Sequence, residues 1–298
     1  LHHLLLERLP FPVVATSANF AEGPILAVDA DRDRVRELAD VVIDHDRDIL
    51  RPLDDSVTRV VSGRIGVTRL ARGFAPLPLP ALERWLDRHA LRRPDAVLAT
   101  GGQQKNAVAL WSGGQAVLGP HVGDLDCERS RVAWREHVGD LVRLYGAEVR
   151  ALAVDLHPDY AARHWAEGTG LKVVGVGHHH AHAASAMVEH DLLDRDVLAL
   201  TWDGTGLGPD GTLWGGECLR VGLRSCERLA TIRPIRLAGG EAAIRQPWRV
   251  GTALVRESLG SVPDSVWPAV SHATAPGVET TLDRGLNSPR RRAWAASS

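Results

Sequence analysis

The sequence is poor in lysine, methionine and cysteine, with two lysines, one methionine and three cysteines among 298 residues. It lacks any run approaching 18 consecutive apolar residues, which excludes a membrane-spanning helix. A formal charge of −2 gives no basic footprint for nucleic acid and no polybasic patch for a membrane surface. Cys127, Cys218 and Cys226 have no CxxC spacing and are too few for a disulfide framework, so we expect a reducing, cytoplasmic setting.

What is present indicates a globular α/β chain. A hydrophobic content of 44% with 24% charged residues is ordinary for globular proteins, and the length allows one large domain or two. In the first 80 residues we predict a buried strand over 12–16, a helix over 32–42 and a hairpin around Gly63. The proline-rich stretch 75–80 is the best domain boundary, which predicts domains of 1–80 and 81–298.

Beyond residue 81, strands alternate with helices and hairpins, the pattern of an α/β lobe. We predict a hairpin turning at Gly113-Gly114 and a helix from about Glu128 to Gly146. The predicted strands are 96–100, 149–154, 172–176 and 197–202.

The strongest local signal is the run Gly177-His178-His179-His180-Ala181-His182 between an apolar strand and a helix. His178 and His182 stand at i and i+4 on that helix, so both can reach one metal ion, zinc or iron, with a carboxylate as third ligand. An isolated pair of this kind more often consists of surface or hydrogen-bonded histidines. Four histidines in five positions favour the metal site, with His180 and His157 as the outer residues to test.

Three further motifs follow predicted strands. Asp203, in DGTG, suits a metal or its water, and the glycines let backbone N–H groups approach a phosphate, although a plain turn is as common. In GGQQKN, Lys105 could meet a phosphate, but a hairpin is the commoner meaning of such a segment. DLHPDY, residues 155–160, places two carboxylates and a histidine at a strand end, where helix capping by Asp159 is the simpler interpretation.

The segment Thr16-Ser17-Ala18-Asn19 offers hydroxyl and amide groups of the kind a nucleotide phosphate site needs. Groups of charged residues follow this segment in the sequence, at 45–47, 54–56 and 69–73. Solvated turns and surface ion pairs are the plainer explanation of these sets.

Together the motifs resemble the HypF family of hydrogenase maturation carbamoyltransferases. The resemblance runs from about Pro12 to Arg249. It rests on TSAN, HDRDI (45–49), DDSV (54–57), ARGFAP (71–76), GGQQKN, GPHVGDLD (119–126), DLHPDY, GHHHAH, DGTGLGPDGTLWGGE and AGGEAAIRQPWR (238–249). It implies the end of a YrdC-like α/β domain, followed by an incomplete actin-like domain of the ASKHA, TsaD-related type.

The resemblance also implies a reaction. Carbamoyl phosphate and ATP, with Mg, give a carbamoyl-adenylate, and the carbamoyl group passes to the C-terminal cysteine of the partner HypE. His178, His182 and Asp203 would then be ligands of zinc or iron. Phosphates would be bound by Lys105, Gly204, Thr205 and Gly206, and Thr16, Ser17, Asn19 and Arg72 would line the adenylation chamber. TSAN and ARGFAP are expected to lie close together.

Departures from the family pattern are also expected to matter. The acylphosphatase-like domain, its zinc fingers and most of the YrdC-like domain have no counterpart here, and Arg290 to Ser298 does not match. We therefore expect a fragment that is inactive alone and tends to aggregate. The alternatives are an antibiotic O-carbamoyltransferase, disfavoured by domain order, a tRNA-modifying synthase, disfavoured by the YrdC-like part, and a non-catalytic remnant that only binds HypE.

Overall fold

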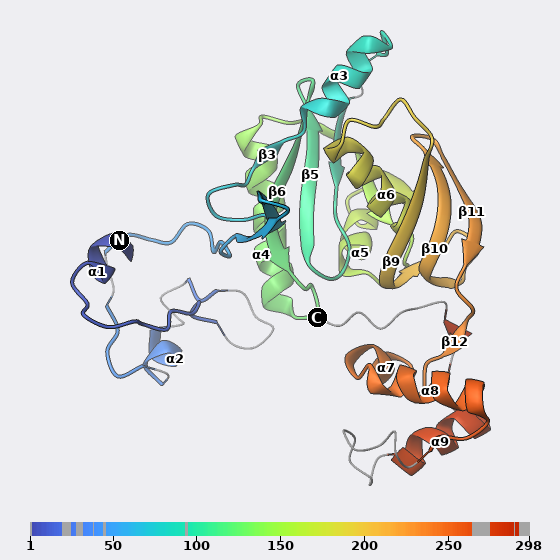
Figure 1. The fold of residues 1–298 in the computed structure, drawn as a ribbon. Helices are drawn as coiled ribbons and strands as arrows, with labels where there is room; N and C mark the ends of the chain where they lie inside the picture. Colours follow the sequence, from blue (N-terminus) through green and yellow to red (C-terminus); the bar gives the residue numbers. More distant parts are fainter. Residues whose placement is uncertain are drawn as a thin grey trace. The chain divides into compact units, whose positions relative to one another are not determined.

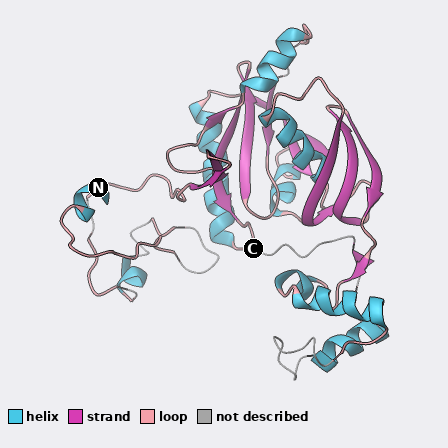
Figure 2. Ribbon diagram, in the orientation of Figure 1, coloured by secondary structure: helices cyan, strands magenta, loops and turns pink. Residues whose placement is uncertain are grey.

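The computed structural model describes residues 2–19, 25–27, 32–37, 39–43, 46–92, 95–263, 275–288 and 290–291. The chain forms two compact units, one of residues 1–77, 103–108 and 118–146 and the other of 78–102, 109–117 and 147–298. The mixture of helices and strands in Figures 1 and 2 confirms the predicted α/β class. Within the described ranges, no helix has the length and apolar character needed to cross a membrane.

The helices are α1 His2–Leu6, α2 Arg32–Arg36, α3 Pro80–Arg88, α4 Glu128–Leu144, α5 Ala161–Glu167, α6 His178–Glu189, α7 Glu241–Arg245, α8 Trp248–Leu259 and α9 Ala275–Arg284. The strands are β1 Val57–Val61, β2 Arg64–Arg69, β3 Leu77–Pro78, β4 Ala96–Ala99, β5 Asn106–Ser112, β6 Gln115–Gly123, β7 Val149–Asp155, β8 Lys172–Val176, β9 Val197–Leu207, β10 Leu213–Gly222, β11 Ser225–Thr231, β12 Ile235–Arg236 and β13 Arg290–Arg291.

Among the described residues before β3, regular structure is limited to α1, α2 and the β1–β2 hairpin. The predicted hairpin is confirmed: β1 and β2 pair antiparallel through Ser62 and Gly63, both at positive φ, as a two-residue hairpin turn requires. The predicted strand over 12–16 is wrong, because the segment pairs with no described strand and Val14 is 95% exposed. The predicted helix over 32–42 is limited to α2, and Leu38, His45 of HDRDI and residues 292–298 lie outside the described residues.

A six-stranded sheet has the order β3-β6-β5-β4-β7-β8. β4 pairs antiparallel with β5 and parallel with β7, which pairs parallel with β8. Buried aliphatic side chains such as Leu98, Leu110 and Leu152 form its core. Because β7 and β8 are parallel and in register at Asp155 and Val176, the residues that follow both strands meet at one edge of the sheet.

A separate antiparallel sheet has the order β11-β10-β9, and α6 packs against β9 and β10 (Figure 1). Ala183 and Met187 of α6 share a buried cluster with Trp214, Leu219 and Val221 of β10. The strand that precedes His178, β8, and the strand that carries Asp203, β9, therefore belong to different sheets. Helix α6 connects the edge of one sheet to the face of the other.

The predicted turn at DGTG is also wrong, since β9 continues through it to Leu207. The reversal occurs at residues 208–212, where Gly208 and Thr212 are hydrogen-bonded and Gly211 has φ 71°. Asp210 builds this turn by accepting hydrogen bonds from Thr212 and from the indole of Trp214. DGTG therefore lies within β9, where Asp203, Gly204 and Thr205 fall at the register irregularity between the pairs Trp202–Gly216 and Gly206–Trp214.

The described residues within 235–263 and 275–288 include β12 and the three helices α7, α8 and α9. A buried cluster joins Ile235 and Leu237 to side chains of α8 and α9, among them Val250, Ala253 and Leu282. α8 ends at Gly260, whose φ of 79° is the left-handed conformation typical of a helix C-terminus.

Candidate metal centre

The histidine run forms the first turns of α6, as its position after an apolar strand predicts. Gly177 is the N-cap residue, and its extended backbone ends β8 and starts the helix. His178 and His182 lie one helical turn apart, with ring centroids 4.8 Å from each other. Their Nε2 atoms are 3.2 Å apart, so both rings present the same nitrogen to one point.

Asp203 of β9 completes the group. Its Oδ2 lies 2.8 Å from Nε2 of His178 and 3.8 Å from Nε2 of His182. One ligand atom from each of the three residues lies within 4.8 Å of the others. The predicted proximity of His182 and Asp203 is thus confirmed. In the described part of the chain this is the group of histidine, cysteine and acidic side chains that can hold a metal ion.

The chemistry of the three atoms fits a cation. His178 donates its Nδ1–H to Asp155, over 2.7 Å, which leaves its Nε2 directed at two other lone-pair atoms. Such atoms repel one another unless a proton or a metal ion lies between them. Two imidazole nitrogens and a carboxylate oxygen are a ligand set that zinc and iron both accept.

Burial and charge shift the acid–base behaviour of this group. Burial disfavours the imidazolium of His178, but hydrogen bonds to Asp155 and Asp203 outweigh it and raise the pKa of His178 to about 9. Burial opposes ionisation of Asp203 as well, yet its contacts with His178 and His182 hold the pKa of Asp203 well below its usual range. A metal ion entering the site therefore competes with a proton held between His178 and Asp203.

Gly206 lies so close to the ring of His178 that there is no room for a side chain at this position. A Cβ on Gly206 would lie 2.6–2.8 Å from three atoms of His178, whereas a Cβ on Gly204 would meet nothing within 4 Å. The backbone N–H of Gly204 donates to Asp203 Oδ1 over 2.7 Å. Three of the four residues predicted to contact phosphate, Gly204, Thr205 and Gly206, thus lie in β9 directly after Asp203.

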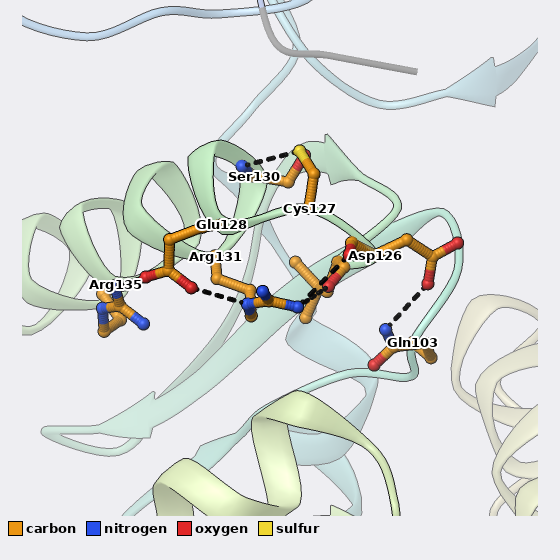
Figure 3. A network of polar contacts seen from close by, with 8 residues as sticks. Gln103, Asp126, Cys127, Glu128, Ser130, Arg131 and Arg135 are labelled. Atoms are coloured by element: carbon orange, nitrogen blue, oxygen red, sulfur yellow. Dashed lines mark hydrogen bonds and ion pairs between the residues drawn. The ribbon is translucent and has the colours of Figure 1, made fainter.

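Lys105 lies in the other unit, in the loop between β4 and β5. Its backbone N–H donates to Asp124 over 2.7 Å, and its side chain is exposed. The neighbouring Gln103 donates to Asp126 over 2.9 Å (Figure 3). The GGQQKN loop is therefore joined to GPHVGDLD, the segment that leads into α4, where Cys127 caps the helix.

The four residues predicted to line an adenylation chamber also lie in that unit. Ser17 donates to Asn19 over 2.7 Å, and Thr16 is exposed beside them. Arg72 instead contacts the DDSV region: it donates to the carbonyl of Leu53 and lies 3.6 Å from Asp55. These contacts join Ser17 to Asn19 and Arg72 to the DDSV region. A common chamber for the four residues stays a prediction.

Sequence reasoning did not place Asp155 beside His178 or Gly206 against its ring. Both contacts depend on which strands are neighbours, and no local spacing reports that. The sequence nevertheless contains a signal for the Asp155 contact. DLHPDY and GHHHAH each follow a predicted buried strand, and strand ends of this kind can meet at one edge of a sheet.

Three family models match the chain. "HypF Kae1-like domain" covers residues 92–189, and "Carbamoyltransferase, Kae1-like Domain, second subdomain" covers 199–293. "Telomere recombination", the Sua5, YciO and YrdC family, covers 1–71.

Whole-chain comparisons agree. Carbamoyltransferase HypF of Synechocystis sp. is 37% identical over 99% of this chain and 38% of its own length, and that of Rhodobacter capsulatus is 39% identical over 97% and 39%. The crystal structure of full-length HypF in the phosphate- and nucleotide-bound form has 32% identity and a TM-score of 0.85, covering 98% of this chain and 45% of that one. The structure of T. kodakarensis HypF has 28% identity and a TM-score of 0.75, over 93% and 37%.

The chain thus spans about two fifths of the length of the curated relatives above. Motifs from the TSAN segment to AGGEAAIRQPWR fall inside the matched region, and the fold agrees over nearly every residue. The sequence and the structure therefore place this chain in the HypF carbamoyltransferase family.

Proposed function

We propose that this chain carries part of a carbamoyltransferase of hydrogenase maturation. Carbamoyl phosphate, ATP and water are converted to a carbamoyl-adenylate with release of phosphate and pyrophosphate. The carbamoyl group is then transferred to the C-terminal cysteine thiol of HypE, with AMP as the leaving group. The observation that carries the proposal is the convergence of His178, His182 and Asp203 in a chain that matches HypF relatives over nearly its whole length.

In this proposal His178, His182 and Asp203 hold zinc or iron. When bound, the ion would polarise the carbonyl of the carbamoyl group. The chain's own groups orient that site: Asp155 and Gly206 fix the ring of His178, and Gly204 fixes the carboxylate of Asp203. A deprotonated carboxylate and two neutral imidazoles are the forms that bind a metal.

The remaining assignments follow the family pattern. ATP with Mg would be contacted by Lys105, Gly204, Thr205 and Gly206, and Thr16, Ser17, Asn19 and Arg72 would belong to the adenylation chamber. The nucleotide-bound form of a full-length HypF structure supports a nucleotide site in this fold. We propose a YrdC-like part over 1–80 and a TsaD-related part over 81–298, and a cytoplasmic location, which the three free cysteines support.

Metal analysis tests the centre. The purified 298-residue chain, loaded with Zn²⁺ or Fe²⁺ and desalted, is expected to retain metal, and a His178→Ala, His182→Ala double variant is expected to lose it. His190→Ala, an exposed residue just past the same helix, is the matched control. Equal metal in the double variant would sink the assignment.

Product analysis tests the reaction. A full-length relative incubated with ATP, Mg²⁺ and carbamoyl phosphate should release pyrophosphate and give a carbamoylated C-terminal cysteine on added HypE, detected by mass spectrometry. The 298-residue chain alone, which spans 38% of the length of its Synechocystis relative, is expected to fail at this transfer. Pyrophosphate release that is equal with and without carbamoyl phosphate would contradict the proposal.

A further inference from the structure

The DLHPDY segment, residues 155–160, lies beside the histidine run although 23 residues separate Asp155 from His178. Asp155 is the last residue of β7 and is in register with Val176, the last residue of β8. His178 follows two residues later and starts α6. The parallel pairing of two strands therefore places this carboxylate next to this imidazole.

Both oxygens of Asp155 are engaged. Oδ2 accepts the Nδ1–H of His178 over 2.7 Å, and Oδ1 accepts the backbone N–H of His157 over 2.8 Å. The carboxylate is only 8% exposed. Arg163 of α5 donates to the carbonyls of Asp155 and Leu156, 3.2 Å each, and so fixes the backbone that carries it. The carboxylate has little freedom to turn away from His178.

This contact determines which nitrogen of His178 is available. With Nδ1–H donated to Asp155, Nε2 faces His182 and Asp203, the direction in which the three ligand atoms converge. Histidines that bind metals generally donate their second ring N–H to a carboxylate or carbonyl, which fixes the ring and raises the basicity of the ligating nitrogen.

We propose that Asp155 is the positioning residue of this centre: it holds the His178 ring so that Nε2, and not Nδ1, is presented to the metal. The inference rests on the proposed metal site, and it gives the DLHPDY motif a role that its sequence alone did not reveal. It replaces two expectations. The ring of His157 stacks on Tyr160, 4.4 Å away, and the ring of His180 lies 3.3 Å from the carbonyl of Gly222. His157 therefore contributes through its backbone N–H to Asp155 rather than through its imidazole. Asp159 does not cap α5, whose N-cap residue is Tyr160.

Zinc affinity of the full 298-residue chain tests the proposal. Zn²⁺ alone is titrated in competition with a chromogenic chelator, and Co²⁺ is used as a spectroscopic substitute. Asp155→Asn, which keeps the shape, and Asp155→Ala are expected to weaken Zn²⁺ binding by about 10–100-fold. They are also expected to shift the visible bands of bound Co²⁺. Asp159→Asn removes an exposed carboxylate of the same segment and should match the wild type.

If Asp155 served only the stability of the fold, Asp155→Asn would lower the melting temperature but leave the Zn²⁺ affinity and the Co²⁺ spectrum unchanged. That result would overturn the proposal.

A second readout needs no metal. In chelator-treated protein with ¹⁵N-labelled histidine, the downfield Nδ1–H resonance of His178, assigned by its loss in His178→Gln, should be present in the wild type and Asp159→Asn and absent in Asp155→Ala. Its persistence in Asp155→Ala would refute the Asp155 contact, whereas failure of the wild type to bind Zn²⁺ would refute the proposed metal site.

Discussion

Gly206 lies against the ring of His178, and its missing side chain is a requirement of the site. A Cβ there would lie 2.6–2.8 Å from three His178 atoms, closer than non-bonded carbon atoms approach. Gly206→Ala should therefore displace the ring, lower Zn²⁺ affinity by about 10-fold or more and destabilise the fold by about 1–3 kcal/mol. Chelator competition and urea unfolding measure the two effects.

Gly204→Ala is the matched control, since a Cβ there meets nothing within 4 Å and the residue lies in the same strand. It should bind Zn²⁺ as the wild type does. Equal affinities for the two alanine variants would contradict the role of Gly206.

At the residue scale, the sequence predicted the two histidines and Asp203 but not the residues that orient them. His178 and His182 are one helical turn apart, so local spacing alone places them together. Asp155 and Gly206 reach His178 from other strands, through pairings that leave no local trace. The convergence of the three candidate ligands could thus be predicted from the sequence, whereas the residues that orient them required the fold.

At the element scale, helix α6 buries one of its histidines, His179, on the face that is turned away from solvent. His179 is 1% exposed and contacts the ring of Trp214. Burial first, and the positive charge of His178 second, lower the pKa of His179 to about 4 from an ordinary value of 6.5. Protons therefore bind the unfolded chain more readily than the folded one between these two pH values.

Acid should therefore destabilise the folded chain through His179. A lowered histidine pKa contributes stability that is complete above pH 6.5 and is lost as the pH falls toward 4, on the order of 3 kcal/mol at most. His178, whose pKa is raised to about 9, changes in a different window, at higher pH. In chelator-treated protein, His179→Leu and His179→Gln should both flatten the decline of unfolding free energy between pH 6.5 and 4. Urea titrations at several pH values test this, and a wild-type slope in both variants would count against it.

Elements formed by local signals were predicted well, and those decided by distant pairing were not. The turns at Gly63 and Gly113-Gly114 need residues that accept positive φ, which the sequence displays. By contrast, the apolar run at 12–16 has strand composition but no described strand to pair with. DGTG has turn composition, yet β10 pairs with β9 as far as Leu207.

At the scale of the whole molecule, the strands that the sequence indicated as one series belong to two different sheets: β4, β7 and β8 lie in the six-stranded sheet and β9 in the three-stranded one. Periodicity identifies a strand and its buried face, but not the sheet that it joins, because membership depends on long-range hydrogen bonding. β8 is the last strand of the six-stranded sheet, and β9 is the last of the three-stranded one. The candidate metal centre lies where α6 leaves the first sheet and packs on the second.

The edge position of β9 has a consequence for solubility. Leu198, Leu200 and Trp202 alternate along the strand and are 67%, 64% and 65% exposed, so one face of an edge strand carries a continuous apolar stripe. Such stripes, next to unpaired backbone groups, promote association between chains. The 298-residue chain should therefore self-associate as its concentration rises.

A Leu198→Lys, Leu200→Lys double variant should reduce that association, because like charges on an edge strand repel a second copy. Light scattering measured over a concentration series should fall in the variant, while its far-UV circular dichroism stays unchanged since both side chains point to solvent. Leu144→Lys, a single replacement at a residue of α4 that is 63% exposed, is the control and should scatter as the wild type does. If the control lowers scattering as much as the double variant, net charge rather than the β9 stripe governs association.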